Sequence, residues 1–232
     1  MKLNINIIRN LIAFISVFLG VTVCYAGPWE DLLGAIKRDD TSAVSTLLLR
    51  GADPNVEVLD QGSLLFIATR EKAIDVATML LKLKQIDVNK STKSGETPLM
   101  IAAFNGDLNL AKELVKRGAQ INKPDWTPLH YAATGGNLSI VEYLVENHAY
   151  IDAESPNNTT PLMMAARHKN LTVMRWLVEN GADPTYTNQE GLSAASYMKR
   201  YKEVDEEAWL LKKAKEFESK FGTRVKPKLV AQ

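Results

Sequence analysis

The sequence predicts an all-α-dominated repeat solenoid, a stack of about six helix-turn-helix units joined by β-hairpin fingers. The first observation behind this prediction is a short motif that recurs at Thr97-Pro98-Leu99, Thr127-Pro128-Leu129-His130 and Thr160-Pro161-Leu162. The copies start 30 residues apart (from 97 to 127) and then 33 residues apart (from 127 to 160). Self-similarity at such a period is typical of stacked supersecondary units, each of which contacts only its neighbours.

The second observation is that the similarity continues well beyond this motif. The first copy runs on through Ala102-Ala103, Leu114-Val115 and Gly118-Ala119, and the next two copies keep this order, with His148 in place of one closing glycine. Thr suits the N-cap of a helix, Pro suits its first helical position, and Gly suits a left-handed turn at its end. Each period therefore predicts two short helices, and the alanine pair keeps the first one slim enough for close approach.

With these residues the repeat resembles the ankyrin repeat, whose signature is Thr-Pro-Leu-His-x-Ala with a period of about 33 residues. The resemblance implies an ankyrin-repeat stack that binds other proteins through a concave groove. It also implies that the Thr, Pro, Leu and Ala residues of the motif are scaffold. His130 is then expected to hydrogen-bond locally, rather than to bind a metal or act in catalysis.

Divergent copies extend the pattern on both sides, so that the predicted ankyrin-repeat domain spans residues 27–221. Its parts are a degenerate N-terminal repeat at 29–58, repeats at about 59–91, 92–124, 125–154 and 155–187, and a C-terminal capping repeat at 188–221. In the last repeat, one helical stripe contains Leu210, Ala214, Phe217 and Phe221. The stripe predicts a capping helix that seals the stack, and the alternative is a helix that binds a partner or a membrane surface.

Residues 1–26 do not belong to the repeats and have the layout of a secretory signal peptide. A short basic region precedes an apolar run over residues 11–23, and Ala26 completes a small–x–small cleavage site. A run of about 13 residues is too short for a comfortable membrane span, which needs about 20. We therefore expect cleavage after Ala26. The alternatives are an uncleaved anchor and a lipoprotein acylated at Cys24, the only cysteine.

The charge of the chain is close to balanced, with 28 basic and 27 acidic residues. Loss of Lys2 and Arg9 with the signal leaves 26 basic residues against 27 acidic ones. Such a chain has no nucleic-acid footprint, and after signal cleavage we expect a monomer that is not associated with a membrane. The tail at 222–232 is basic and is expected to be disordered.

No catalytic or metal-binding pattern is visible in the sequence. The three histidines, His130, His148 and His168, are widely spaced, and no H-E-x-x-H, G-x-S-x-G, C-x-x-C or Walker motif is present. We therefore predict that the protein is not an enzyme and has no catalytic residue, no metal site and no cofactor. An enzyme with an unrecognised site is the alternative.

The resemblance places partner-binding positions at the finger tips and at the last exposed residues of each first helix. These helix-end pairs are Lys37-Arg38, Arg70-Glu71, Phe104-Asn105, Thr134-Gly135, Arg167-His168 and Arg200-Tyr201. Their row is biased toward basic residues and contains aromatic ones, which interface hot spots favour together with Arg. The predicted partner-binding residues are Phe104, Asn105, Trp126, Arg167, His168, Arg200 and Tyr201.

Trp126 is included because the period shrinks beside it from 33 to 30 residues, which makes its finger three residues short. A short finger opens a notch in the wall of the groove. The tryptophan either anchors a partner in this notch or folds over to cover it.

These expectations combine into a non-catalytic protein-interaction module that binds an unidentified protein as an adaptor, an inhibitor or an enzyme-supporting factor. The short signal is typical of bacteria, which makes the periplasm the expected location. The alternative is a protein secreted outside the cell, as an effector that binds a host protein.

Overall fold

The computed structural model describes residues 29–58 and 61–222, so the predicted signal peptide and nearly all of the predicted tail lie outside the described residues. Twelve helices follow one another in the described residues. They are α2 (Trp29–Lys37), α3 (Thr41–Leu49), α4 (Leu64–Arg70), α5 (Ile74–Leu81), α6 (Pro98–Asn105), α7 (Leu108–Lys116), α8 (Pro128–Gly135), α9 (Leu138–Glu146), α10 (Pro161–Arg167), α11 (Leu171–Glu179), α12 (Ala194–Arg200) and α13 (Val204–Phe221).

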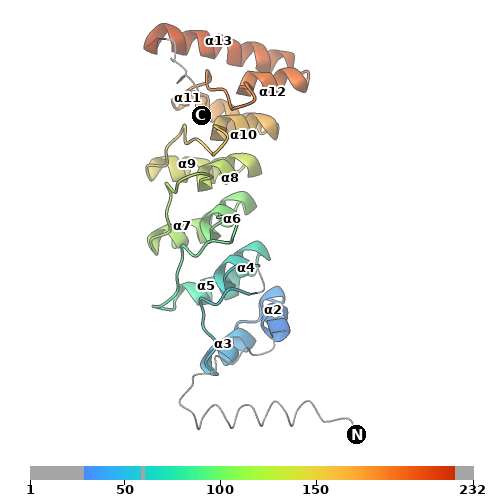
Figure 1. Ribbon diagram of the computed structural model, residues 1–232, viewed down its shortest axis with the longest axis vertical. Helices are drawn as coiled ribbons and strands as arrows, with labels where there is room; N and C mark the ends of the chain where they lie inside the picture. The colour runs from blue at the N-terminus through green and yellow to red at the C-terminus, as the bar shows by residue number, and fades with distance from the viewer. Residues whose placement is uncertain (1–28, 59–60, 223–232) are drawn as a thin grey trace, which may run out of the picture.

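The helices form two columns along an elongated stack (Figure 1). The first helices of the six pairs, α2, α4, α6, α8, α10 and α12, contact one another in that order. The second helices, α3, α5, α7, α9, α11 and α13, make up the other column (Figure 1). This arrangement confirms the predicted all-α repeat solenoid.

The fingers differ from the expected β-hairpins, because the described residues contain no strand beyond one isolated bridge between Glu57 and Ser63. Most fingers are closed by two backbone hydrogen bonds, for example from Thr92 N–H to Glu96 O and from Gly95 N–H to Thr92 O, both at 2.9 Å. A loop this short has room for these two bonds and not for a ladder. The short finger at 121–127 makes none, and the N–H of Thr127 instead binds the side chain of His130.

The motif residues occupy the helix positions that their chemistry predicts. The hydroxyls of Thr97 and Thr160 accept the N–H groups of Met100 and Met163, and a proline follows at the first helical position. Gly118 follows the second helix of its repeat with φ +91°, a conformation that costs little only for glycine. Interactions and backbone conformations within a repeat therefore determine where its helices begin and end.

The core is one column of apolar side chains that runs through all six helix pairs, from Leu32 to Leu210. Alanine pairs such as Ala102-Ala103 and Ala132-Ala133 are fully buried, since the first helix of the next repeat lies against them. Their small side chains bring neighbouring backbones close together. Each repeat thus buries its apolar faces only against its neighbours, and the two ends of the stack need caps.

Asparagine side chains connect successive repeats on the loop side of the stack. The amide of Asn55 donates to a carbonyl of the following repeat and accepts an N–H from it, both at 2.7 Å. Asn89 and Asn122 make the same pair of bonds in the next two joints. In the joint after these, Asp152 accepts the N–H of Asp183 at 3.0 Å. A bond of this kind contributes about 1 kcal/mol, so the ladder adds directly to the cohesion between repeats.

A second set of asparagines closes the side of the stack where the first helices end. Asn137 Nδ2 donates to the carbonyls of Ala103 and Phe104, at 3.0 and 2.9 Å. Asn170 makes the equivalent two bonds to the end of α8, at 2.8 and 2.9 Å. The last carbonyls of a helix have no partner within it. Each of these asparagines therefore satisfies the helix end of the repeat before it.

Two glycines make room for this second set. A Cβ on Gly106 would lie 2.6 Å from Asn137 Oδ1, and one on Gly136 would lie 2.6 Å from Asn170 Oδ1. Both glycines have positive φ, at +82° and +75°. Where the next repeat offers no such asparagine, the same left-handed position holds a residue with a side chain, namely Asp39, Lys72, Lys169 or Lys202. Glycine and asparagine thus occur as matched pairs in neighbouring repeats.

The helix α13 closes the C-terminal end of the stack with 18 residues, against nine in α11. Along the predicted stripe, Leu210 is buried, Ala214 and Phe217 are partly buried, and Phe221 is 64% exposed. The first half of α13 therefore caps the last repeat, whereas its final turn is open to solvent. No helix in the described ranges is both long enough and apolar enough to cross a membrane.

His130 is fully buried and connects two repeats. Its Nδ1 accepts the N–H of Thr127 at 3.2 Å, and its Nε2 lies 2.9 Å from the carbonyl oxygen of Thr159, before α10. These two bonds fit a neutral ring with its hydrogen on Nε2. Burial is the largest cause that lowers the pKa of His130, from its ordinary value of 6.5 to about 4.

Lowering the pH should therefore reduce the free energy of unfolding, because His130 stays neutral in the folded stack at a pH where it is protonated in the unfolded chain. A depressed folded-state pKa gives stability that is fully present above about pH 6.5 and is lost as the pH falls to about 4. The loss is about 3 kcal/mol, since one pKa unit corresponds to about 1.4 kcal/mol. Urea denaturation at pH 7 and pH 4 measures it, with His130→Met as the control because Met100 and Met163 hold the equivalent positions. An equal loss in His130→Met would show that His130 is not responsible.

Candidate partner-binding surface

The six turns that join the first and second helix of each repeat lie on one side of the stack, and we call them the turn edge. They comprise residues 38–40, 71–73, 106–107, 136–137, 168–170 and 201–203. Six of the seven predicted partner-binding residues lie on this edge or within the two residues before it. Trp126 lies elsewhere, before the start of α8.

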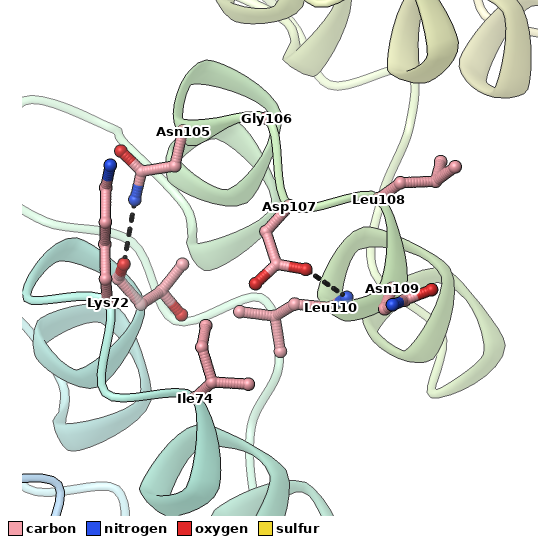
Figure 2. A pocket seen from close by; sticks show the side chains of 9 residues that line it. Lys72, Ile74, Asn105, Gly106, Asp107, Leu108, Asn109 and Leu110 are labelled. Atoms are coloured by element: carbon pink, nitrogen blue, oxygen red, sulfur yellow. Dashed lines mark hydrogen bonds between the residues drawn. The ribbon is translucent and has the colours of Figure 1, made fainter.

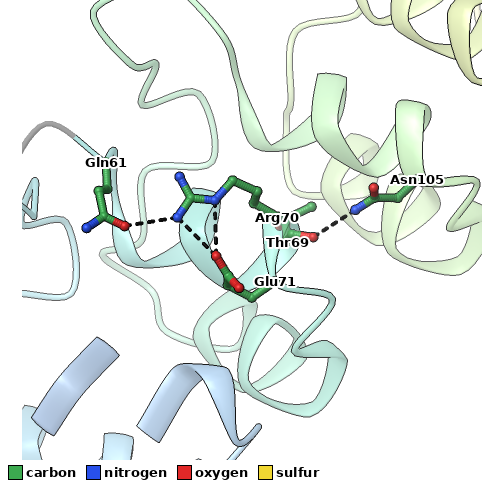
Figure 3. A network of polar contacts seen from close by, with 5 residues as sticks. All are labelled: Gln61, Thr69, Arg70, Glu71 and Asn105. Carbon is green, nitrogen blue, oxygen red and sulfur yellow. Dashed lines mark hydrogen bonds and ion pairs between the residues drawn. The ribbon is translucent and has the colours of Figure 1, made fainter. Parts of the chain in front are cut away.

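Phe104 and Asn105 end α6 and have different surroundings. The ring of Phe104 is 48% exposed, which leaves a large apolar side chain open to solvent. Asn105 is partly buried, and its Nδ2 donates to Thr69 O, at the end of α4, at 3.0 Å (Figure 3). Phe104 is therefore free to contact a partner, whereas the amide of Asn105 already holds two repeats together.

Trp126 is partly buried and packs against the core. Its ring meets the ring of His130 edge-on, with centroids 5.2 Å apart. This contact favours the alternative in which the tryptophan folds over the gap left by the short finger. Its placement before α8 also separates it from Phe104 by about the length of a first helix, roughly 12 Å for eight residues.

Four predicted residues do come together, at the joint between the last two helix pairs. Arg167 ends α10 and His168 follows it, whereas Arg200 ends α12 and Tyr201 follows that helix; all four side chains are exposed. The hydroxyl of Tyr201 donates to Arg167 O at 2.8 Å. It therefore bonds the helix end of the preceding repeat, as the asparagine amides do in other joints. Burial and the neighbouring Arg167 lower the pKa of His168.

Arg70 is less available than its place in the helix-end row predicts. Its guanidinium donates to Glu71 Oε1, at 3.1 and 3.2 Å, and to Gln61 Oε1 at 3.0 Å (Figure 3). The charges of Arg70 and Glu71 therefore neutralise each other. The bias of the row toward positive charge is correspondingly smaller than the sequence indicates.

The predicted partner-binding residues do not include three lysines of the turn edge. Lys72, Lys169 and Lys202 follow the helix-end pairs and have φ between +58° and +61°. Lys169 Nζ lies 2.6 Å from Glu203 Oε1, which closes the last joint with an ion pair. The signal that could have found them is the repeat itself, because these lysines replace the glycines at positions 106 and 136.

A pocket of about 490 Å³ lies on the turn edge between the second and third repeats (Figure 2). Lys72, Ile74, Asn105 and Asp107 are among its lining residues. Asp107 holds the place that Asn137 holds one repeat later, but its carboxylate turns back to accept its own helix's Leu110 N–H at 2.9 Å. Asn105 supplies one amide bond in this joint, to Thr69 O, but Asp107 leaves open the space that Asn137 and Asn170 fill in the next two joints, and the pocket lies there.

Completing this joint should stabilise the protein. The double variant Lys72→Gly with Asp107→Asn restores the glycine–asparagine pair of the following joints. We expect a gain of about 1 kcal/mol in the free energy of unfolding, from relief of a left-handed lysine and from a further amide bond to the end of α4, where Thr69 O already accepts from Asn105. Urea denaturation measures the gain, and Lys72→Gly alone is the control. A double variant that is no more stable than this control would contradict the role given to the asparagines.

The site contains little that resembles catalytic machinery. Tyr131 donates to Glu96 Oε1 at 3.0 Å, and burial followed by this bond raises the pKa of its hydroxyl. In the parts of the chain that the structure describes, no group of three or more His, Cys, Asp or Glu side chains is placed to hold a metal. What the surface offers is exposed aromatic rings and charges on a rigid frame.

Comparison with known proteins agrees with this architecture. Residues 32–125 and 122–188 match the family described as ankyrin repeats in three copies. The fold is similar to the crystal structure of the human ASB11 ankyrin repeat domain, with a TM-score of 0.69, 25% sequence identity, and coverage of 84% of this chain and 85% of that one. The chain belongs to the ankyrin-repeat family, and ankyrin repeats are protein–protein interaction modules.

Curated relatives share only part of their length with this chain. It is 35% identical over 88 residues to alpha-latrocrustotoxin-Lt1a of Latrodectus tredecimguttatus, which covers 38% of this chain and 6% of that protein. It is 31% identical over 86 residues to transient receptor potential cation channel subfamily A member 1 of Homo sapiens, covering 37% and 8%. Rabankyrin-5 of Mus musculus is 30% identical over 97 residues, covering 41% and 8%. The chain thus spans less than a tenth of each relative.

Proposed function

We propose that this protein is a non-catalytic interaction module of the periplasm, which binds a partner protein through its first-helix column and turn edge. It would act there as an adaptor, an inhibitor or an enzyme-supporting factor. The observation that carries the proposal is the exposed ring of Phe104, held on a helix whose other residues are buried or bonded to neighbouring repeats. Exposed aromatic side chains on a rigid frame suit interface anchors, because little entropy is lost when they bind.

The cluster around Arg167, Arg200 and Tyr201 supports the same face. It adds a second group of aromatic and basic side chains, the residue types enriched in hot spots. Both groups lie at the ends of first helices. A partner that follows the turn edge could contact both.

The periplasmic location rests on the layout of residues 1–26 and on the expected cleavage after Ala26. Intact-mass analysis of the exported protein should give a chain that begins at Gly27. A chain that begins at Met1 or at an acylated Cys24 would contradict it. The alternative function, a secreted effector that binds a host protein, uses the same scaffold and differs in the compartment of its partner.

Partner capture from periplasmic extract, followed by alanine substitution, tests the proposed face. Phe104→Ala should weaken binding of the captured partner by about 2 kcal/mol, roughly thirtyfold, and should leave stability nearly unchanged. Trp126→Ala should lower stability even without partner, because its ring packs on His130. Calorimetric titration and thermal unfolding give both quantities.

Leu49→Ala is the matched control, since Leu49 on α3 is 89% exposed and lies in the other helix column. It removes an apolar side chain that is more accessible than Phe104 and lies away from the proposed face. Partner binding that resists Phe104→Ala but is lost in Leu49→Ala would move the interface to the second-helix column.

A further inference from the structure

A row of aromatic side chains runs along the second-helix column, one in each of the last three repeats. Tyr143 on α9, Trp176 on α11 and Trp209 on α13 are each the sixth residue of their helix. All three are partly buried, so each ring keeps some surface open to solvent. Figure 1 shows their helices as successive members of one column.

A cationic side chain from the preceding repeat lies over two of these three rings. Lys112 Nζ lies 5.7 Å from the centre of the Tyr143 ring, and the guanidinium carbon of Arg175 lies 4.7 Å from that of Trp209. Both distances suit a cation–π interaction. Lys112 and Arg175 are each the fifth residue of their helix, so one helix position supplies the cation and the next repeat supplies the ring.

The middle ring, that of Trp176, has a carboxylate where its neighbours have a cation. The fifth residue of α9 is Glu142, which is partly buried and makes no hydrogen bond or ion pair with the described part of the chain. A carboxylate gains nothing from the negative face of an indole ring. A cation placed between the two groups would satisfy both.

The nearest charges on these helices do not supply that cation. α9 contains no Lys or Arg, and the one basic residue of α11, Arg175, is bonded to Glu206 at 2.7 Å and lies over Trp209. Glu146 and Glu179 end the same two helices and are exposed. The outer face of α9 and α11 therefore has three carboxylates and a tryptophan, and its one cation is already engaged.

We propose that Glu142 and Trp176 form a receptor site for an arginine or lysine side chain in a basic segment of a partner protein. The triad of Glu206, Arg175 and Trp209 shows the same kind of contact within the chain, a guanidinium paired with a carboxylate over an indole, although Glu206 lies on the helix of its ring and Glu142 lies on the preceding second helix. In the receptor site, Glu142 and Trp176 supply the carboxylate and the ring, and the partner supplies the cation.

Glu146 and Glu179 extend the site from a single side chain to a segment. Glu146 lies one helical turn beyond Glu142 on α9, and Glu179 is its equivalent on α11. A second basic residue of the segment would pair with them. The inference rests on the proposed function and names the chemistry of a partner, but it uses the second-helix column rather than the turn edge.

Titration with a short basic peptide tests this site directly. The probe is acetyl-Arg-Gly-Arg-Gly-Arg-amide, added to the chain that begins at Gly27, and the indole N–H signal of Trp176, assigned with Trp176→Phe, is followed by NMR. We expect this signal to move and the affinity to fall at least tenfold in Glu142→Lys, which gives the ring its own cation. Glu142→Gln should weaken binding in the same direction with a smaller change of charge.

Glu190→Lys is the matched control, because it makes the same change of charge at an exposed finger position before α12. It should leave the affinity within twofold. Equal binding by Glu142→Lys, or a Trp176 signal that does not move, would overturn the proposal. So would binding of tetramethylammonium as tight as that of the peptide, or binding that occurs only after removal of residues 223–232.

The outcome is separable from that of the proposed function. A natural partner that binds Glu142→Lys with unchanged affinity and is lost in Phe104→Ala would overturn this inference alone. A partner that is lost in Glu142→Lys and retained in Phe104→Ala would support the site and place the interface on the second-helix column.

Discussion

The joint between neighbouring repeats is the constraint on which the rest of this structure depends. A pair of helices seven to nine residues long cannot bury an apolar face by itself. Alanine pairs allow the helices of successive repeats to approach, and the carbonyls left free at helix ends are then bonded by asparagines of the next repeat. Because an amide such as that of Asn137 occupies the space over Gly106, the joint fixes the residue types in two repeats at once.

The joints also determine which side chains remain available for function. Where the glycine–asparagine pair is intact, the turn edge is filled and neutral. Where Lys72 and Asp107 replace the pair, a pocket opens, and where Lys169 and Glu203 replace it, an ion pair closes the joint. The same logic applies to the second-helix column, where Glu142 interrupts a repeated cation–ring contact. Departures from the repeat therefore mark the candidate sites more clearly than the repeat itself.

Much of the fold could be predicted from the sequence, because the Thr-Pro-Leu motif encodes helix starts and the closing glycines encode helix ends. The fingers could not be predicted correctly, since two backbone bonds within a short loop do not make a strand. The exposure of Phe104 and the proximity of Arg167 to Tyr201 followed from their position in the repeat. The contact of Trp126 with His130 and the cations over Tyr143 and Trp209 did not, because they depend on side-chain directions across repeats.

The central claim is that the stack holds together only through its joints and needs a cap at each end. The most direct measurement compares the thermal unfolding of a chain that ends at Gly191 with one that ends at Gly222. The first lacks α12 and α13 and exposes the apolar face of α10 that α12 covers, whereas the second lacks only the tail. We predict a lower melting temperature or aggregation for the chain that ends at Gly191. Equal melting temperatures for the two chains would contradict the account.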